Sequence, residues 1–352
     1  TKYVFSHNIL TFLIYILSIN YFFNYFKKIF SKNILIISIL FFHSFYMSLH
    51  TLEFIDPTNY LIPFGLILTV QTFKVLSNEI KLKNIIKFSL ILTMAMFTKL
   101  SFLPFAISCL IPFILKIFQG LKILHAIKNF LFLIFSLFIF TILWNLPIIG
   151  RIPKILYMAV FSRDDTLLNF EKLFTFFNNF FIFFVEKKFI FLVLILITII
   201  AAFLFYIKSA VFLFLKKIKL QNRDFYIFIF GFLLFLSFNY TLLNTSEEYE
   251  LFNNEPGVGD LLRNCFHYSL FLIPFLYFYK NKKNFLFFFN ILVTLAFLNN
   301  LYFYEKHRLL AKKNLVKHEK IFFEKTDKYL LNKRIAIFSN GYPYGSLILH
   351  HI

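Results

Sequence analysis

Long runs of apolar residues, separated by short polar linkers, dominate this chain. A helix needs about 20 mostly apolar residues to cross the hydrocarbon core of a bilayer. Lipid offers the backbone no hydrogen-bond partners, so runs of this kind fold as helices. The predicted fold class is therefore an all-α polytopic membrane protein. Its transmembrane helices, about ten in number, are expected near residues 9–26, 33–51, 58–74, 84–98, 101–118, 128–146, 188–207, 225–243, 265–279 and 284–304.

Composition indicates that lipid is the main solvent of the chain. Hydrophobic residues make up 59% of it and charged residues 15%, whereas soluble domains have roughly 45–50% and about 25%. The net charge of +20 would suit nucleic acid, but a nucleic-acid binder gathers its basic residues on one solvated face. Here they lie in short clusters between apolar runs. The predicted partner is thus the lipid bilayer, with no nucleic acid.

The polar linkers alternate in charge along the chain, which predicts the topology. Cytoplasmic loops retain lysine and arginine, so the basic linkers are predicted to be cytoplasmic. The acidic linkers, residues 51–57 and 244–264, are predicted to face outward. The basic linkers contain Lys27, Lys28 and Lys32; Lys74, Lys81, Lys83 and Lys87; Lys116, Lys122 and Lys128; Lys208, Lys216, Lys217, Lys219 and Arg223; and Lys280, Lys282 and Lys283.

Two domains are predicted. Residues 1–304 form the transmembrane domain, whose outward loop at about 147–187 holds an interfacial helix over Ile155 to Phe161. Residues 305–352 begin a small α/β extracytoplasmic segment, because a charged helical stretch is followed by an alternating, strand-like one. An even number of crossings places both ends outside. Since the chain starts with Thr1 and has no signal segment, we expect one more helix upstream and a truncated C-terminal segment.

The first candidate site is the outward linker that holds Glu53 and Asp56. These carboxylates are three residues apart, a spacing that places them on one face of a helix. Ionisable groups at membrane depth are costly and are functional candidates by default. Asp56 also directly precedes Pro57, where a helix is expected to start, so it is either a helix cap or a catalytic carboxylate.

The second candidate is Lys99, in the linker Lys99-Leu100-Ser101 between two short apolar runs. The runs form either a tight hairpin or a re-entrant pair. This linker is predicted to face outward, and a cation there departs from the charge pattern of the other short linkers. Lys99 either snorkels to the interface or binds a phosphate at the lipid surface.

The third candidate is the segment that starts at Asp260 and includes Arg263, His267 and Tyr268. Arg263 and His267 are four residues apart, so a helix aligns them on one face. Arg263 either pairs with Asp260 or binds an anionic head group through two hydrogen bonds.

Four further residues are predicted to pack rather than to react. His43 and His50 have no spaced partners that would make a metal site. Cys109 and Cys265 lie inside apolar runs, where cysteine behaves as a small hydrophobe.

The order of these features resembles the GT-C superfamily of membrane glycosyltransferases, in the branch of protein O-mannosyltransferases and lipid A aminoarabinose transferases. In that branch an outward loop ends in Asp before a helix, a lysine-rich cytoplasmic loop follows, and a short helix then ends in Thr-Lys. Residues 9–118 follow this plan, with Asp56 at the acidic position and Thr98-Lys99 at the Thr-Lys. The stretch from Arg263 to Pro274 is similar to the family's Arg-Tyr before a Pro-containing helix, although Asn264-Cys265-Phe266-His267 separate Arg263 from Tyr268.

The resemblance implies an enzyme of the bacterial inner membrane that moves a sugar from a polyprenyl-phosphate donor to a lipid, glycan or protein acceptor on the outer face. Asp56 and Glu53 would be the catalytic carboxylates, and Lys99, Arg263, His267 and Tyr268 would bind the donor phosphate. A divalent metal on Asp56 is compatible with this chemistry but not required by it. The family's principal catalytic Asp lies in the first outward loop, which we expect to lie upstream of Thr1.

Three rival interpretations remain open. A transporter or flippase of lipid-linked glycans also needs many helices and outward cations, but the sequence lacks the paired broken helices of an inverted repeat. An O-antigen polymerase-like protein should have an Arg-rich outward loop, and residues 147–187 contain only Arg151 and Arg163. A purely structural membrane protein leaves Asp56 and Lys99 unexplained.

The charge pattern predicts an accessible outer face and a protected inner one. In intact cells, a cysteine introduced between residues 53 and 56 should react with a membrane-impermeant maleimide. A cysteine introduced between residues 27 and 32 should not react. Equal labelling of the two positions would contradict the topology.

Overall fold

The computed structural model describes most of the predicted apolar segments. It covers residues 2–44, 60–78, 80–98, 102–119, 123–146, 150, 197–198, 200–208, 222–245, 266–302 and 305. Within these ranges the regular structure is helical throughout, with no strand. The all-α prediction is therefore confirmed for the described part of the chain.

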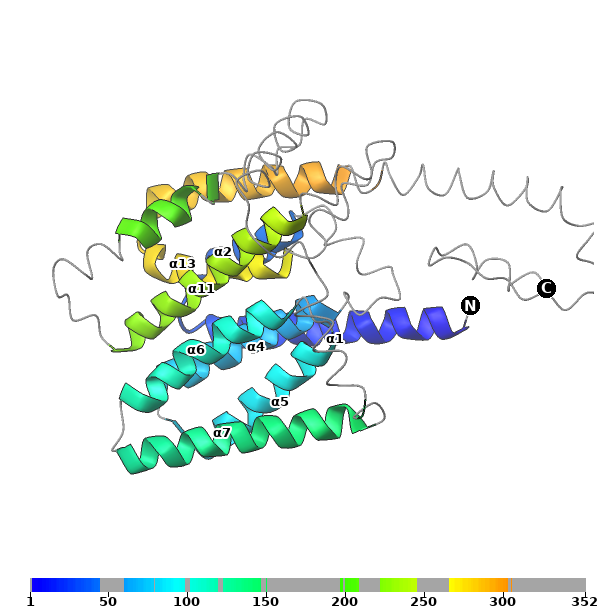
Figure 1. Ribbon diagram of the computed structural model, residues 1–352. Helices are drawn as coiled ribbons and strands as arrows, with labels where there is room; N and C mark the ends of the chain where they lie inside the picture. Colours follow the sequence, from blue (N-terminus) through cyan, green and yellow to red (C-terminus); the bar gives the residue numbers. More distant parts are fainter. Residues whose placement is uncertain are drawn as a thin grey trace, which may run out of the picture.

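The helices lie side by side and run back and forth along one direction (Figure 1). Their order is α1 (Lys2–Phe26), α2 (Lys32–His43), α4 (Leu61–Ser77), α5 (Leu82–Thr98), α6 (Leu103–Gln119), α7 (Ile123–Trp144), α11 (Asn222–Thr245), the 3-10 helix η5 (Phe266–Phe271) and α13 (Leu272–Tyr279). Residues 200–208 and the stretch Lys283–Tyr302 are also helical.

Three of the helical stretches are long and apolar enough to cross a membrane, namely Ile9–Phe26, Ile123–Trp144 and Lys283–Tyr302. Their outer faces are rich in exposed apolar side chains, such as Leu17 (64% exposed) and Phe288 (65% exposed). Exposed apolar faces of this extent are unfavourable in water and favourable against lipid. These features indicate a multi-pass membrane protein, while the expected total of about ten crossings remains a prediction.

Helix α4 lies at the centre of the bundle and contacts α1, α5, α6, α11 and η5. Its side chains are buried or half-buried on every side, as expected of a helix with no lipid-facing side. Two of its hydroxyls are satisfied within the helix: the Thr69 hydroxyl donates to the Gly65 carbonyl (2.7 Å) and the Thr72 hydroxyl to the Leu68 carbonyl (2.8 Å). Hydroxyls paired in this way can be buried at little cost.

Helices α5 and α6 are separate elements rather than a closed hairpin. Helix α5 packs mainly against α7 and α4, whereas α6 packs mainly against α11. On α6, the Ser108 hydroxyl lies 3.1 Å from the Ser237 hydroxyl of α11. Cys109, next to it, is fully buried, so its predicted packing role is confirmed.

Aromatic side chains fill the space between residues 200–208, α11 and α13. The Tyr206 ring stacks on that of Phe235, with ring centroids 5.5 Å apart. Gly231 on α11 allows the close approach, since a Cβ there would lie 2.6 Å from Pro274 Cβ and would also clash with the Tyr206 hydroxyl. Small residues bring membrane helices together in this manner.

Helix ends next to the lysine-rich linkers gather at one end of the bundle. The Lys116 ammonium, near the end of α6, donates to the carbonyls of Val75 (2.7 Å) and Leu76 (3.0 Å) near the end of α4. Tyr277 near the end of α13 donates to Asp224 at the start of α11 (2.8 Å). In Figure 1 the end of α6 and the start of α11 lie on the same side. This is the arrangement that alternating topology requires.

Several predicted features fall outside the described residues. They are the interfacial helix over 155–161 in the 147–187 loop, the strand-like stretch 334–341 in the C-terminal segment, and Cys265. The division into domains at residue 304 therefore stays a prediction.

Replacing Gly231 with alanine should destabilise the bundle by about 1–3 kcal/mol, because the added methyl overpacks a rigid contact with Pro274. Unfolding of the detergent-solubilised protein would measure this loss. Gly150→Ala is the matched control, since no heavy atom of the described structure lies within 4 Å of its added methyl. Equal stability of the two variants would show that the α11–α13 contact is looser than described.

Candidate functional site

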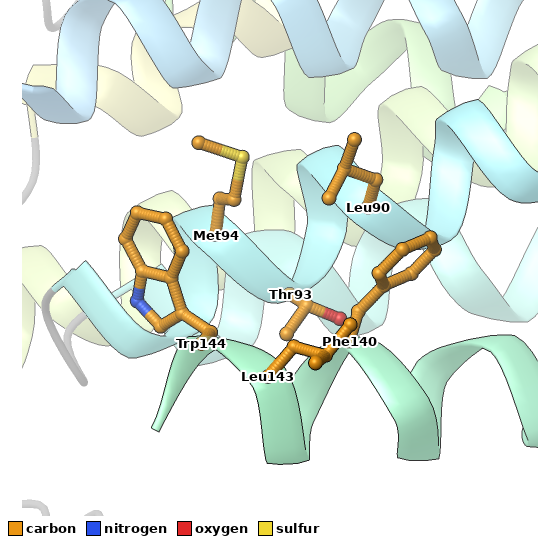
Figure 2. Close-up of a pocket in the computed structure, with 6 residues that line it drawn as sticks. All are labelled: Leu90, Thr93, Met94, Phe140, Leu143 and Trp144. Atoms are coloured by element: carbon orange, nitrogen blue, oxygen red, sulfur yellow. The ribbon is translucent and has the colours of Figure 1, made fainter. Parts of the chain in front are cut away.

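An apolar hollow between α5 and α7 is the candidate binding feature that the described residues form. Its volume is about 200 Å³. Figure 2 shows the six side chains that line it, which come from α5 and α7. They are Leu90, Thr93, Met94, Phe140, Leu143 and Trp144.

Helical periodicity explains why these side chains share one space. On α5 the lining residues are at positions 90, 93 and 94, and on α7 they are at 140, 143 and 144. Spacings of three and four residues place side chains on one face of a helix. Because α5 and α7 pack closely, their two faces enclose the hollow.

The hollow has a buried floor and an exposed mouth. Thr93 is 1% exposed, whereas Leu143 is 61% exposed and Trp144 is 44% exposed. The Thr93 hydroxyl has no hydrogen-bond partner among the described residues, and Figure 2 shows it between the helices, on the side of Phe140. Such a space can hold a hydrocarbon chain. Its lining includes no acid, base or cation.

The hollow lies one helical turn from the end of α5. The predicted site residue Lys99 follows that end in the sequence. The Thr98 hydroxyl, at the last residue of α5, donates to the carbonyl of Met94 (2.6 Å), which lines the hollow. Lys99 is the next residue in the chain, and it lies outside the described residues. Thr98, the last residue of α5, therefore lies one turn from a residue that lines the hollow.

The other predicted site residues also lie largely outside the described part. Glu53, Asp56 and Arg263 are not described. For His267 and Tyr268 the backbone lies in η5, and their side chains are not described. Whether these residues converge therefore remains a prediction.

The helices that flank these residues do pack together. Helix α4, which follows Asp56 in the chain, contacts both α5, which precedes Lys99, and η5, which follows Arg263. Leu270 of η5 approaches Gly65 in the first half of α4, its Cδ1 lying 2.9 Å from where a Gly65 Cβ would be. The three segments that lead to the predicted site are therefore neighbours in space.

His43 joins three helices and is buried, which confirms its predicted packing role. The Tyr15 hydroxyl of α1 hydrogen-bonds to its Nε2. The Asn300 amide of Lys283–Tyr302 donates to its backbone carbonyl at 2.7 Å. Among the described residues no group of three metal-binding side chains occurs. His50 lies outside the described residues.

Sequence reasoning missed the hollow because its lining residues are individually ordinary. The available signals were weak: Trp144 is the only tryptophan of the chain, and Thr93 interrupts an otherwise apolar helix face. Neither signal identifies the helix that lies opposite.

No family model matches this chain, and no curated protein and no solved structure matches it significantly.

Replacing Thr93 with valine should raise stability by about 1 kcal/mol, because a buried hydroxyl without a partner is costly and valine keeps its shape. The matched control is Thr69→Val, which removes a hydroxyl that donates to Gly65 and should lower stability by about 1 kcal/mol. Thermal unfolding in one detergent compares the two. A loss in both variants would mean that Thr93 has a partner in the intact protein.

Proposed function

We propose that this chain is a membrane glycosyltransferase that moves a sugar from a polyprenyl-phosphate donor to a lipid, glycan or protein acceptor. The reaction takes place on the outer face of a bacterial inner membrane. This proposal rests on the order of the sequence motifs that resemble the GT-C superfamily.

One structural observation supports the proposal in addition to the sequence motifs. Helix α4 packs against both α5 and η5. Asp56 lies shortly before α4, Lys99 directly after α5, and Arg263 shortly before η5. The arrangement therefore favours a shared site for the acidic and the basic residues.

The chemistry requires groups of opposite charge at this place. A carboxylate from Asp56 or Glu53 would take the proton from the acceptor hydroxyl as it attacks the sugar carbon. Lys99 and Arg263, with His267 and Tyr268 beside them, would stabilise the negative charge of the departing phosphate. A divalent metal held by Asp56 would serve the same end.

The α5–α7 hollow suits the apolar part of such a donor. Its lining is almost wholly hydrocarbon, and its mouth is exposed. A polyprenyl chain that rests there would have its phosphate near the end of α5, where Lys99 follows. Binding would displace lipid from the mouth.

Asp56→Asn in the full-length gene product should lower sugar transfer by about 100-fold or more, because the substitution keeps the shape of the side chain but removes the base. Mannosyl and aminoarabinosyl polyprenyl phosphates are the donors to test in proteoliposomes. Equal membrane insertion of both proteins, measured by yield and thermal unfolding, would exclude a folding defect.

Lys99→Met should instead raise the donor concentration needed for half-maximal transfer, since it keeps the apolar stem and removes the cation. Lys87→Met is the matched control, because Lys87 is exposed near the other end of α5. Unchanged transfer in both Asp56→Asn and Lys99→Met would favour a transporter of lipid-linked glycans.

A further inference from the structure

A cluster of charged side chains lies at the end of the bundle where the helices meet the lysine-rich linkers. This cluster is separate from the proposed transfer site. It begins at Lys74 of α4, whose ammonium donates to the Tyr21 hydroxyl of α1 (2.6 Å). The same ammonium lies 4.4 Å from the centroid of the Tyr21 ring and 5.3 Å from that of Tyr25. Cations above aromatic faces are held by the ring quadrupole.

The cluster continues across α11 and α13. The Arg223 guanidinium lies 5.7 Å from the ring centroid of Tyr277, and the Lys280 ammonium lies 4.6 Å from the same centroid. Arg223 is also close enough to the Tyr25 hydroxyl to interact with it electrostatically. Three cations and three tyrosines thus form one group, the basic-tyrosine cluster: Lys74, Arg223, Lys280, Tyr21, Tyr25 and Tyr277.

The positive charge of this cluster is not balanced by its own helices. Asp224 is the only carboxylate in the sequences of α1, α4, α11 and α13, and it accepts a hydrogen bond from Tyr277. Lys116 brings a further positive charge close to Arg223. Like charges held together favour a bound anion.

Arg223 has unused hydrogen-bonding capacity. Its Nε is buried and has no partner among the described residues. A buried guanidinium donor without an acceptor is costly. A phosphate oxygen is the acceptor whose geometry a guanidinium matches best.

The surroundings of the cluster select a lipid rather than a soluble anion. Leu17, one turn before Tyr21 on α1, is exposed, and so are Leu13 and Ile16 beside it. An apolar stripe on α1 therefore runs from the cluster along the membrane-facing surface. It can receive acyl chains while the cluster holds the head group.

We propose that the basic-tyrosine cluster binds the phosphate head group of an anionic phospholipid from the adjoining leaflet, with its acyl chains along α1. Side chains that are half-buried, as these are, are ordered before the lipid arrives and remain reachable from the interface. Bound lipid would hold α1, α4, α11 and α13 together.

The test uses phosphatidylglycerol and phosphatidylcholine as probes, with the full-length protein in nanodiscs of each lipid and in mixtures. Native mass spectrometry should find phosphatidylglycerol retained in preference to phosphatidylcholine. Arg223→Gln and Lys74→Met should each lower this preference about fivefold, the effect of removing one basic residue near an anionic surface. Thermal unfolding should show stabilisation by phosphatidylglycerol in the wild type and less in each variant.

Lys87→Met is the matched control, because it removes the same charge near the same end of the bundle, from an exposed position on α5 outside the cluster. It should keep the full preference. Lys280→Met provides a third cluster variant should Arg223→Gln not fold. A Lys87→Met effect equal to those of the cluster variants would overturn the proposal in favour of bulk charge attraction. Displacement of the lipid by millimolar inorganic phosphate would overturn it in favour of a soluble anion.

Discussion

Hydrogen bonding of the backbone in a solvent without hydrogen-bond partners is the constraint on which this structure depends. In lipid, each unpaired amide or carbonyl is costly, and a helix pairs them all within one segment. The described part of the chain accordingly consists of helices. The buried hydroxyls of Thr69 and Thr72 obey the same rule, since each donates to a carbonyl one turn earlier.

Once the backbone is satisfied, packing decides how the helices associate. Lipid tails are as apolar as the side chains, so shape matters more than hydrophobicity. Gly231 illustrates this point, because its missing side chain lets Pro274 and Tyr206 approach α11. Aromatic rings fill the remaining volume around it, as Phe228 and Phe232 do where they pack against Tyr206. The chain contains 58 phenylalanines, and their rings are well suited to fill the space between helices.

Polar chemistry is then confined to the helix ends and to a few buried links. At one end the cations are held by tyrosine rings and by helix carbonyls, as Lys116 is by Val75 and Leu76. Within the bundle, Tyr15 and Asn300 connect through His43. The proposed transfer site and the proposed lipid site use different helix ends. A defect in one can therefore be separated from a defect in the other by experiment.

The sequence by itself determined the class of protein, the approximate position of most helices and the alternation of basic linkers. It did so because membrane-crossing length and charge distribution are local properties that a single segment displays. It also indicated that His43 packs, since it has no spaced metal-binding partners, and that Cys109 packs, since it lies inside an apolar run. The expected site at Asp56, Lys99 and Arg263 remains a prediction from motif order. Only the tertiary structure decided that α5 faces α7 around Thr93, that α4 occupies the centre, and that Lys74, Arg223 and Lys280 converge. These contacts involve residues far apart in the chain. They depend on the fit between two helix surfaces, and the sequence of one helix does not show which surface lies opposite.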